Sequence, residues 1–326
     1  MSFTISGTGS ALPSRVVSNE QLGSFLETSD EWIRSRTGIA ERHVLTQESL
    51  KDLAAKAGLD ALRMAGIAAD ELDLIICATT ASDHLIPSLA CEVQSFIGAV
   101  CPAFDINAAC SGFLYSLDVA AGYFCRKPSS RILVIAADAM SRIVDWRQRS
   151  TCVLFGDGAG AVVLTGGEDL LSIQLSATGD DKIIVLNGPK GNSPFAPSQA
   201  DHPFVSMIGK EVYRFAVTSS ARDLIKVLEL AGLEQENLDL VLLHQANARI
   251  MDAVSSRLRI PKEKFISNIT HCGNTSAASI PILLDELNRQ GSLKPGMVLA
   301  MSSFGGGLTT GACILRWQDT GADARL

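Results

Sequence analysis

Two stretches of the chain, residues 65–77 and 231–243, repeat the same order of apolar and polar positions. In each, an amphipathic pattern ends at a glycine, Gly66 or Gly232, and a short polar loop leads into an uninterrupted apolar run. Apolar residues spaced at three and four positions predict a helix, and a short apolar run between turn residues predicts a buried strand. A glycine just after a helix predicts a left-handed C-cap. The pattern therefore predicts one helix–loop–strand unit twice.

Two further apolar runs extend this repeat. Residues 131–137 resemble 296–302, and residues 160–164 resemble 311–315, in the same order along each half of the 326-residue chain. A period of half the chain is too long for a solenoid, whose repeats span roughly 20 to 50 residues. We therefore predict a duplicated α/β unit, with halves at 1–172 and 173–326. The alternation of helices and strands favours largely parallel sheets.

The stretch 176–203 is rich in proline and glycine, so we expect it to connect the halves and to carry loops over a site. Beyond it, the C-terminal residues 318–326 are polar and predict a flexible tail.

Composition narrows the class of protein. The chain is 47% hydrophobic, yet no stretch of membrane-spanning length is free of charge, so we expect no transmembrane segment. The N-terminus lacks an export signal, which favours a cytoplasmic protein. A net charge of −7 argues against general binding to nucleic acid. The eight cysteines form no Cys-x-x-Cys pair, which argues against a disulfide framework and against a zinc site.

One cysteine has a context suited to chemistry. In residues 105–117 an extended stretch breaks at small residues, and a helical pattern begins directly after Cys110. The positive end of a helix dipole stabilises a thiolate, which is the nucleophilic form of cysteine. We therefore expect Cys110 to be a covalent nucleophile, and the other seven cysteines to be buried and inert.

A histidine and an asparagine complete a catalytic hypothesis. His244 ends an apolar strand pattern, at the edge where open α/β sheets place their sites. Asn274 opens a segment of small residues that corresponds, in the duplicated frame, to the neighbourhood of Cys110. Together they offer a nucleophile, a proton or hydrogen-bond partner and an amide donor. The alternative is that His244 only ends a strand and Asn274 only caps a helix. We interpret His43, His84, His202 and His271 as surface or structural histidines.

Three glycine runs have different meanings. The run that starts at Gly7 resembles a dinucleotide fingerprint, but Leu12 replaces its third glycine, and residues 156–160 lead into a strand instead of a helix. Neither run supports a nicotinamide or flavin cofactor. Residues 305–307 are three adjacent glycines whose backbone N–H groups could complete an oxyanion hole, although a crowded turn explains them equally well.

Seven motifs, in one order along the chain, resemble the β-ketoacyl-acyl carrier protein synthase III family of the thiolase superfamily. They are residues 29–33, 36–39, 101–105, 109–113, 155–161, 244–247 and 273–279. The resemblance implies an α/β, thiolase-like, internally duplicated fold with five layers, α-β-α-β-α. It also implies a dimeric acyltransferase that starts fatty-acid biosynthesis.

The resemblance implies a reaction in two halves. Cys110 would take an acyl group from acyl-coenzyme A while the backbone N–H groups of Cys110 and Gly306 hold the carbonyl oxygen. Malonyl-acyl carrier protein would then lose carbon dioxide, with His244 and Asn274 stabilising the enolate and Phe304 assisting. No metal or redox cofactor is implied, because the coenzyme A thioester is a substrate.

The resemblance also assigns binding residues. Coenzyme A recognition falls on Trp32 and Arg149, which would sandwich adenine, with Thr28, Arg36 and Asn247 in support. Contacts to the acidic carrier protein fall on Arg214, Arg249 and Arg257.

Some residues depart from the family pattern, namely Leu308, Thr310 and the loop 179–182, and they leave the acyl chain and the acceptor open. A paralogue that transfers or condenses acyl groups in specialised metabolism is therefore an alternative function. A papain-like protease shares the chain order Cys, His, Asn but not the residues around its cysteine. A non-catalytic binding module is the remaining alternative.

Overall fold

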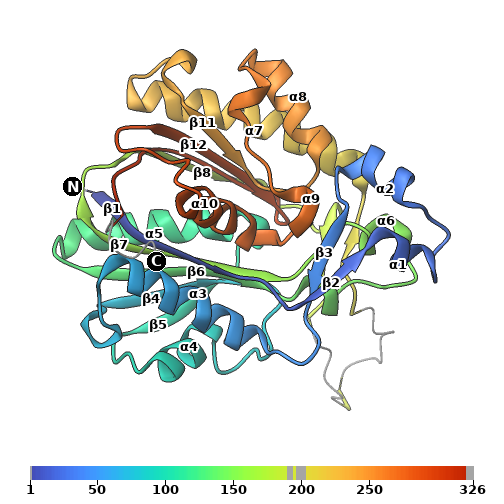
Figure 1. Ribbon diagram of the computed structural model, residues 1–326, viewed down its shortest axis with the longest axis horizontal. Helices are drawn as coiled ribbons and strands as arrows, with labels where there is room; N and C mark the ends of the chain where they lie inside the picture. Colours follow the sequence, from blue (N-terminus) through green and yellow to red (C-terminus); the bar gives the residue numbers. More distant parts are fainter. Residues whose placement is uncertain (1, 189–193, 196–202, 321–326) are drawn as a thin grey trace.

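Two β-sheets lie on either side of a central pair of helices in the computed structural model, which describes residues 2–188, 194–195 and 203–320 (Figure 1). The first sheet has the strand order β1-β7-β6-β4-β5, and the second has the order β11-β12-β13-β8. The strands of the first sheet are β1 (Ser2–Ala11), β4 (Leu74–Ala78), β5 (Ala103–Ile106), β6 (Arg131–Asp138) and β7 (Gly158–Gly167). Those of the second are β8 (Leu170–Ala177), β11 (Leu240–Leu243), β12 (Val298–Gly305) and β13 (Thr309–Arg316).

The duplication is visible in both sheets. The repeated strand patterns occupy β4 and β11, β6 and β12, and β7 and β13, as the sequence predicts. The edge strand β5 has only a reduced counterpart, a single parallel bridge between Val241 and Phe265. The helix caps repeat too, because Gly66 and Gly232 both adopt φ of 65° and end their helices in the left-handed conformation.

The prediction of largely parallel sheets is wrong. In the first sheet β4 pairs parallel with β5 and β6, and in the second β11 pairs parallel with β12. The pairs β1–β7, β6–β7, β12–β13 and β8–β13 are antiparallel. Only residues 306–308 separate β12 from β13, which is too short for the crossover that parallel strands need. Each sheet is therefore mixed.

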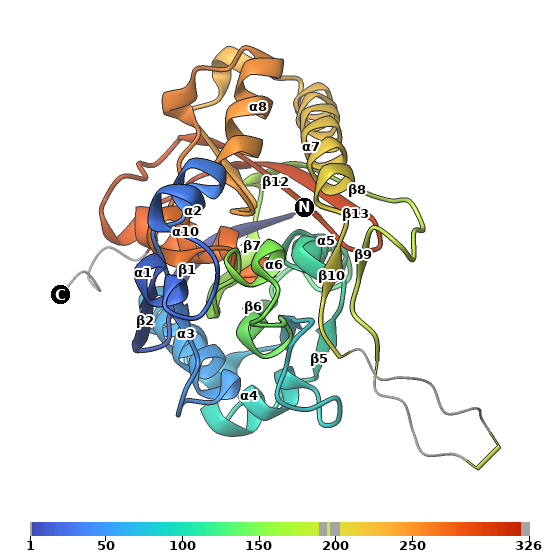
Figure 2. The same ribbon diagram turned by 90° about the vertical axis from the view of Figure 1, so that its right-hand side faces the viewer.

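Three layers of helices separate and cover the sheets, which gives five layers in all (Figures 1 and 2). Helices α3 and α4 cover the outer face of the first sheet, α5 and α10 fill the centre, and α7 and α8 cover the second sheet. Their bounds are α3 (Leu50–Ala65), α4 (Leu89–Ile97), α5 (Gly112–Arg126), α7 (Gly209–Ala231), α8 (Ala248–Leu258) and α10 (Ser279–Arg289).

Shorter elements surround one end of the sheets. They are β2 (Arg15–Ser18), β3 (Glu41–Val44), β9 (Ile184–Val185), β10 (Ser206–Met207), α1 (Asn19–Gly23), α2 (Asp30–Thr37), α6 (Arg149–Cys152) and α9 (Ile269–Cys272). The expected connection 176–203 includes the end of β8 and all of β9, while 189–193 and 196–202, with His202, lie outside the described residues. Among the described residues, no helix combines the length and apolarity that a membrane crossing requires.

The first glycine run serves packing. A Cβ atom at Gly7 would lie 2.2 Å from the carbonyl oxygen of Ala61, and one at Gly9 would lie 2.1 Å from that of Ala57. Both contacts are with α3, so β1 lies against this helix at a distance that only glycine permits. This close approach explains a glycine pattern that only partly resembles a nucleotide-binding motif.

Two expectations need correction. Residues 318–320 are docked instead of flexible, because Gln318 donates to Asp169 Oδ1 at 2.7 Å and Thr320 is buried beside Asn288; residues 321–326 lie outside the described residues. All eight cysteines are free thiols, but Cys125, near the end of α5, is exposed, and Cys91 is only partly buried.

Candidate active site

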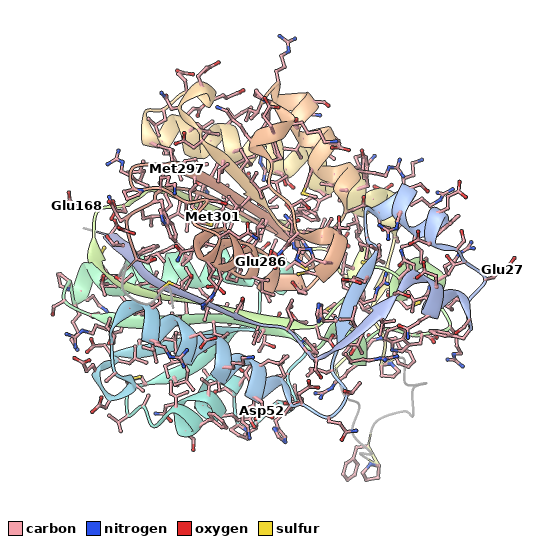
Figure 3. All side chains as sticks on the ribbon, viewed as in Figure 1. Glu27, Asp52, Glu168, Glu286, Met297 and Met301 are labelled. Carbon is pink, nitrogen blue, oxygen red and sulfur yellow. The ribbon has the colours of Figure 1, made fainter. Side chains whose placement is uncertain are left out.

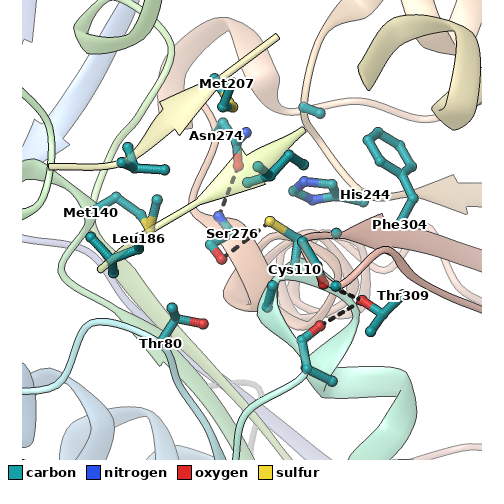
Figure 4. A pocket seen from close by; sticks show the side chains of 18 of the residues that line it. Thr80, Cys110, Met140, Leu186, Met207, His244, Asn274, Ser276, Phe304 and Thr309 are labelled. Atoms are coloured by element: carbon teal, nitrogen blue, oxygen red, sulfur yellow. Dashed lines mark hydrogen bonds between the residues drawn. The ribbon is translucent and has the colours of Figure 1, made fainter. Parts of the chain in front are cut away.

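The two central helices begin side by side, and this junction positions the nucleophile. A short 3-10 turn precedes each helix, η2 (Ala109–Ser111) before α5 and η6 (Ser276–Ala278) before α10. The first residue of each turn is left-handed, with φ of 47° at Ala109 and 53° at Ser276. The structural counterpart of Cys110 is therefore Ala277, three residues beyond Asn274. Across the junction, the Ser276 hydroxyl donates to Cys110 Sγ at 3.4 Å (Figure 4).

His244 follows β11 and is fixed on two sides. Its backbone N–H donates to the carbonyl of Ser302 at 2.8 Å, and its Nδ1 hydrogen-bonds Ser279 Oγ at 2.8 Å. Its ring meets the edge of Phe304, with the centroids 5.2 Å apart. Burial lowers the pKa of His244 to about 3, so the imidazole is neutral near pH 7. The remaining nitrogen, Nε2, serves as donor or acceptor according to the proton shared with Ser279.

Asn274 is oriented by its own backbone neighbours. Its Oδ1 accepts from the backbone N–H of Ser276 at 2.9 Å, which leaves Nδ2 as a free donor group for a ligand. Its main chain bonds to Leu154 and Gly156 at 2.9 and 3.0 Å. A Cβ at Gly156 would lie 2.4 Å from the Cys272 carbonyl, so the glycine run is closely packed where it enters β7.

Cys110, His244 and Asn274 line one cavity of about 410 Å³ (Figure 4). The structure thus brings together the three residues that the sequence singles out, and the interpretation of His244 and Asn274 as mere caps does not account for this convergence. Most other lining side chains are apolar: Met140, Ile143, Phe155, Ile184, Leu186, Val205, Met207, Val212 and Phe304. An apolar cavity of this size suits a small acyl group.

Burial opposes the thiolate that the helix start is expected to stabilise at Cys110. Although the residue keeps partial exposure, desolvation raises the pKa of the Cys110 thiol to about 12. The Ser276 hydrogen bond lowers this pKa and the charge of Asp138 raises it, but both effects are smaller than desolvation. Cys110 also lies within the turn η2, two residues before the first residue of α5. The nucleophile is therefore a neutral thiol that must lose its proton during reaction.

Sequence reasoning missed Asp138 as a residue of this site. Its buried carboxylate accepts from the backbone N–H groups of Thr80, Ala81 and Ala277 at 2.7, 3.0 and 3.3 Å, and it also contacts the Ser276 hydroxyl. Asp138 thus ties the end of β4 to the turn η6. Because its partners are 57 to 139 positions away, no local motif announces this role.

We expect Ser276→Ala to raise the pKa of Cys110 further, because the hydroxyl favours the anionic form of the sulfur. A hydrogen bond to a charged group contributes about 1.5–3 kcal/mol, so alkylation by iodoacetamide should slow by about tenfold and its pH profile should move upward. The measurement is the alkylation rate against pH. Ser116→Ala, which removes a hydroxyl within α5, is the control. An unchanged profile would show that Ser276 does not tune the thiol.

The three adjacent glycines lie against the nucleophile turn. A Cβ at Gly305 would lie 2.7 Å from Cys110 N, and one at Gly306 would lie 3.7 Å from the Cβ of Ala109. Thr309 Oγ1 donates to the Ala108 carbonyl at 2.9 Å and so joins the β12–β13 hairpin to the same turn. The glycine run and the turn that carries Cys110 are therefore in close contact.

The departures from the family pattern lie outside this cavity. Thr309 and the glycines line it, whereas Leu308 lines a separate hollow and Thr310 is buried. In the loop 179–182, the N–H of Asp180 donates to the Gly307 carbonyl at 2.7 Å. The loop therefore holds the β12–β13 hairpin at its glycine run through this hydrogen bond.

A second cavity, of about 520 Å³, adjoins the first because Asn274 lines both. Arg36, Asn247 and Arg249 line it, and Asn247 Nδ2 donates to the Arg36 carbonyl at 3.0 Å. Arg36 and Arg149 both lie against the Trp32 ring, with guanidinium carbons 4.9 and 4.4 Å from its centroid. A base that stacks between Trp32 and Arg149 must therefore displace the arginine.

The other predicted binding residues are dispersed. Thr28 keeps a buried hydroxyl oxygen without a hydrogen-bond partner. Arg249 lines the second cavity, with its guanidinium 6.0 Å from the Tyr213 ring centroid, whereas Arg214 pairs with Glu211 on α7 and Arg257 lines a separate hollow beside Arg222. Of the three arginines predicted to bind a carrier protein, only Arg249 lines the cavity that adjoins the active site.

A five-layered duplicated fold with a cysteine, a histidine and an asparagine in one cavity defines a thiolase-like condensing enzyme. Comparisons with known proteins specify the family. Profiles described as 3-oxoacyl-[acyl-carrier-protein] synthase III and its C-terminal domain match residues 104–179 and 228–317. The chain belongs to the β-ketoacyl-[acyl-carrier-protein] synthase III family, and it is an acyltransferase that initiates fatty-acid synthesis.

Individual relatives are similar over nearly the full length. A β-ketoacyl-[acyl-carrier-protein] synthase III of Synechococcus elongatus is 48% identical, with 96% of each chain covered, and that of Xanthomonas campestris is 44% identical, with 96% of this chain and 98% of the relative covered. The crystal structure of the Aquifex aeolicus synthase III has a TM-score of 0.91 at 44% identity, covering 97% of this chain and all of that one.

Proposed function

We propose that the chain condenses an acyl group from acyl-coenzyme A with malonyl-acyl carrier protein through a thioester on Cys110. The observation that carries this proposal is the convergence of Cys110, His244 and Asn274 in an apolar cavity that adjoins a second, arginine-lined one. The second cavity offers a path for a pantetheine arm, and Trp32 with Arg149 offers a platform for adenine.

In the first step, Cys110 Sγ attacks the thioester carbonyl. The new C–S bond forms as the bond to the coenzyme A sulfur breaks, and the thiol proton passes through His244 Nε2 to the departing sulfur. The neutral imidazole can relay the proton, but its lowered pKa makes it a weak base, so the proton moves as the C–S bonds form and break. The backbone N–H groups of Cys110 and Gly306 hold the carbonyl oxygen as it becomes negative.

In the second step, the malonyl thioester loses carbon dioxide and its carbonyl oxygen becomes an enolate. Asn274 Nδ2 and the His244 Nε2–H donate to this oxygen, the latter when Ser279 donates to Nδ1. The apolar ring of Phe304 beside His244 disfavours the charged carboxylate and so promotes its loss. The carbon nucleophile then attacks the acyl-cysteine carbonyl, a C–C bond forms as the C–S bond to Cys110 breaks, and the expelled thiolate takes a proton from solvent to become the thiol again. This sequence uses no metal or redox cofactor.

The test is mass spectrometry of the folded protein after incubation with a panel of acyl-coenzyme A thioesters. We expect an acyl mass on the peptide that contains Cys110, and release of that mass on addition of malonyl-acyl carrier protein. Acylation followed by transfer to an amine or alcohol instead would favour a role in specialised metabolism. An unmodified Cys110 across the whole panel would contradict the proposal.

The coenzyme A platform gives a separate prediction. We expect Trp32→Ala to raise KM for acyl-coenzyme A by about tenfold with little change in kcat, because base–aromatic stacking contributes about 1–3 kcal/mol. Steady-state kinetics with acyl-coenzyme A and with a short acyl-pantetheine thioester measure the effect. The pantetheine substrate, which lacks adenine, should not respond to the substitution.

The matched control is Tyr123→Ala, which removes a partly buried aromatic that also lies under an arginine, with the Arg126 guanidinium carbon 4.8 Å from the ring centroid. This variant should keep the parental KM. An equal loss in the two variants, or an unchanged KM in Trp32→Ala, would exclude the platform.

We also propose that the protein is a cytoplasmic homodimer. Strand β5 is an edge of the first sheet, and several apolar side chains near it are exposed: Leu85, Ile86, Phe96, Val100 and Phe104. An exposed edge strand with apolar neighbours favours pairing with another chain. Light scattering on the purified protein tests this, and a monomer at micromolar concentration would contradict it.

A further inference from the structure

Three potential metal ligands gather where α9 meets α10, outside the reaction cavity. His271 Nε2 lies 3.1 Å from Glu286 Oε1, and Cys272 Sγ lies 3.7 Å from the same oxygen. The ligand atoms of the three residues all lie within 4.8 Å of one another. Glu286 projects from α10 near the middle of the molecule as seen in Figure 3. The proposed reaction uses none of these three residues.

The separations fit a tetrahedral zinc ion. Zinc binds histidine nitrogen, thiolate sulfur and carboxylate oxygen at about 2.0–2.3 Å. Tetrahedral geometry then separates neighbouring ligand atoms by about 3.3–3.8 Å. The distances of 3.1 and 3.7 Å to Glu286 Oε1 lie near this range, and the third separation, between His271 and Cys272, is no more than 4.8 Å, so binding requires side-chain movements of about an ångström. Imidazole, thiolate and carboxylate are also the ligand types that zinc prefers.

The surroundings support entry and orientation of a cation. The His271 side chain is 49% exposed and that of Glu286 is 23% exposed, while Cys272 lies buried beneath them, so an ion has access from solvent. Asn268 Nδ2 donates to Glu286 Oε2 at 3.0 Å and holds the carboxylate with Oε1 toward the histidine and the cysteine. Ligands fixed by such hydrogen bonds bind metal more tightly. The negative charge of Glu41 acts on both His271 and Cys272.

We propose that His271, Cys272 and Glu286 form a zinc site whose fourth ligand is water. Binding displaces the thiol proton to solvent and forms a Zn–S bond. The absence of a Cys-x-x-Cys pair argues against zinc only for sites built from cysteine pairs. Here two ligands are adjacent in sequence and the third comes from the next helix, so tertiary structure creates the site. The ion would fix the end of α9, two residues before Asn274.

The experiment uses the full chain with Cys110→Ala, because Cys110 and His244 could bind zinc themselves. Calorimetric titration with Zn²⁺ should give one site per chain. Titration with Co²⁺ should produce an absorption band of thiolate-to-cobalt charge transfer, which reports directly on sulfur coordination. Both readouts are independent of acyl transfer. A negative result would therefore contradict the zinc site without contradicting the proposed function.

Ligand variants identify the residues. Glu286→Gln, His271→Ala and Cys272→Ser, each added to Cys110→Ala, should weaken Zn²⁺ binding by more than about tenfold, since losing even a hydrogen-bond partner of a ligand costs about 10- to 100-fold. Cys272→Ser should also abolish the charge-transfer band. His84→Ala is the matched control, because His84 pairs with Glu92 at 3.0 Å in another His–carboxylate pair. It should bind as the parent does.

Two outcomes overturn the proposal. One is the lack of a stoichiometric zinc site in the folded Cys110→Ala protein. The other is binding that persists unchanged in Glu286→Gln and His271→Ala, whose side chains are partly exposed and whose folding circular dichroism can verify. These two variants keep the test decisive even where replacement of the buried Cys272 destabilises the protein.

Discussion

Cys110→Ser will lower acyl transfer by about 10⁴-fold or more, which is the scale on which removal of a covalent nucleophile acts. Serine keeps the size of the side chain and the hydrogen bond to Ser276, but its hydroxyl is a far weaker nucleophile than a thiol at the same place. The measurement combines steady-state condensation with intact-protein mass spectrometry, so that turnover and acylation are followed separately.

Cys125→Ser is the matched control for this experiment. Cys125 lies near the end of α5, the helix that follows Cys110. Its side chain is exposed and lines neither of the two cavities of the site. The control should retain both acylation and turnover. Substantial turnover in Cys110→Ser would show that the acyl group does not pass through this sulfur.

Asn274→Asp should separate the two halves of the reaction. The aspartate retains an oxygen for the Ser276 N–H but replaces the Nδ2 donor, and a negative charge would face the developing enolate. Loss of one such donor costs about 10²- to 10³-fold, so condensation should fall at least that far. Acylation of Cys110 should change by less than about tenfold, because the first step uses the backbone donors of Cys110 and Gly306.

The measurements are single-turnover acylation and the release of carbon dioxide from malonyl-acyl carrier protein. Asn274→Ala removes the donor without adding charge and should show the same separation, since the backbone bonds to Leu154 and Gly156 remain. Asn237→Ala, in the short turn η4 (Gln235–Asn237), is the control and should behave as the parent. Equal losses in both steps would place Asn274 in a general structural role instead.

The parts of the fold that depend on neighbouring residues were predictable from the sequence. Gly66 and Gly232 predict the ends of two helices because a left-handed cap favours a residue without a Cβ atom. The apolar runs that become β6 and β12 are unbroken because both faces of these strands are covered. Strand direction was not predictable, since it depends on how each connection crosses the sheet.

The electrostatics of the site depend on distant contacts. The residue types around Cys110 predict a nucleophile, but the cavity wall that raises its pKa includes residues 244, 274 and 304–307, far away in the chain. The same applies to His244, whose low pKa follows from burial between β12 and α10. The helix start describes only the local field at the sulfur, whereas the folded chain adds desolvation, which raises the pKa of Cys110.

The left-handed residues that start η2 and η6 show how the two copies of the duplicated unit differ at the site. Ala109 and Ser276 hold the same place in their copies, so Cys110 and Ala277 do as well. The first copy carries the thiol of Cys110. The second copy has the methyl group of Ala277 at the corresponding position and contributes the Ser276 hydroxyl instead. The two copies therefore have different tasks at this junction: one supplies the sulfur that reacts, and the other supplies the hydrogen bond that lowers the pKa of that sulfur.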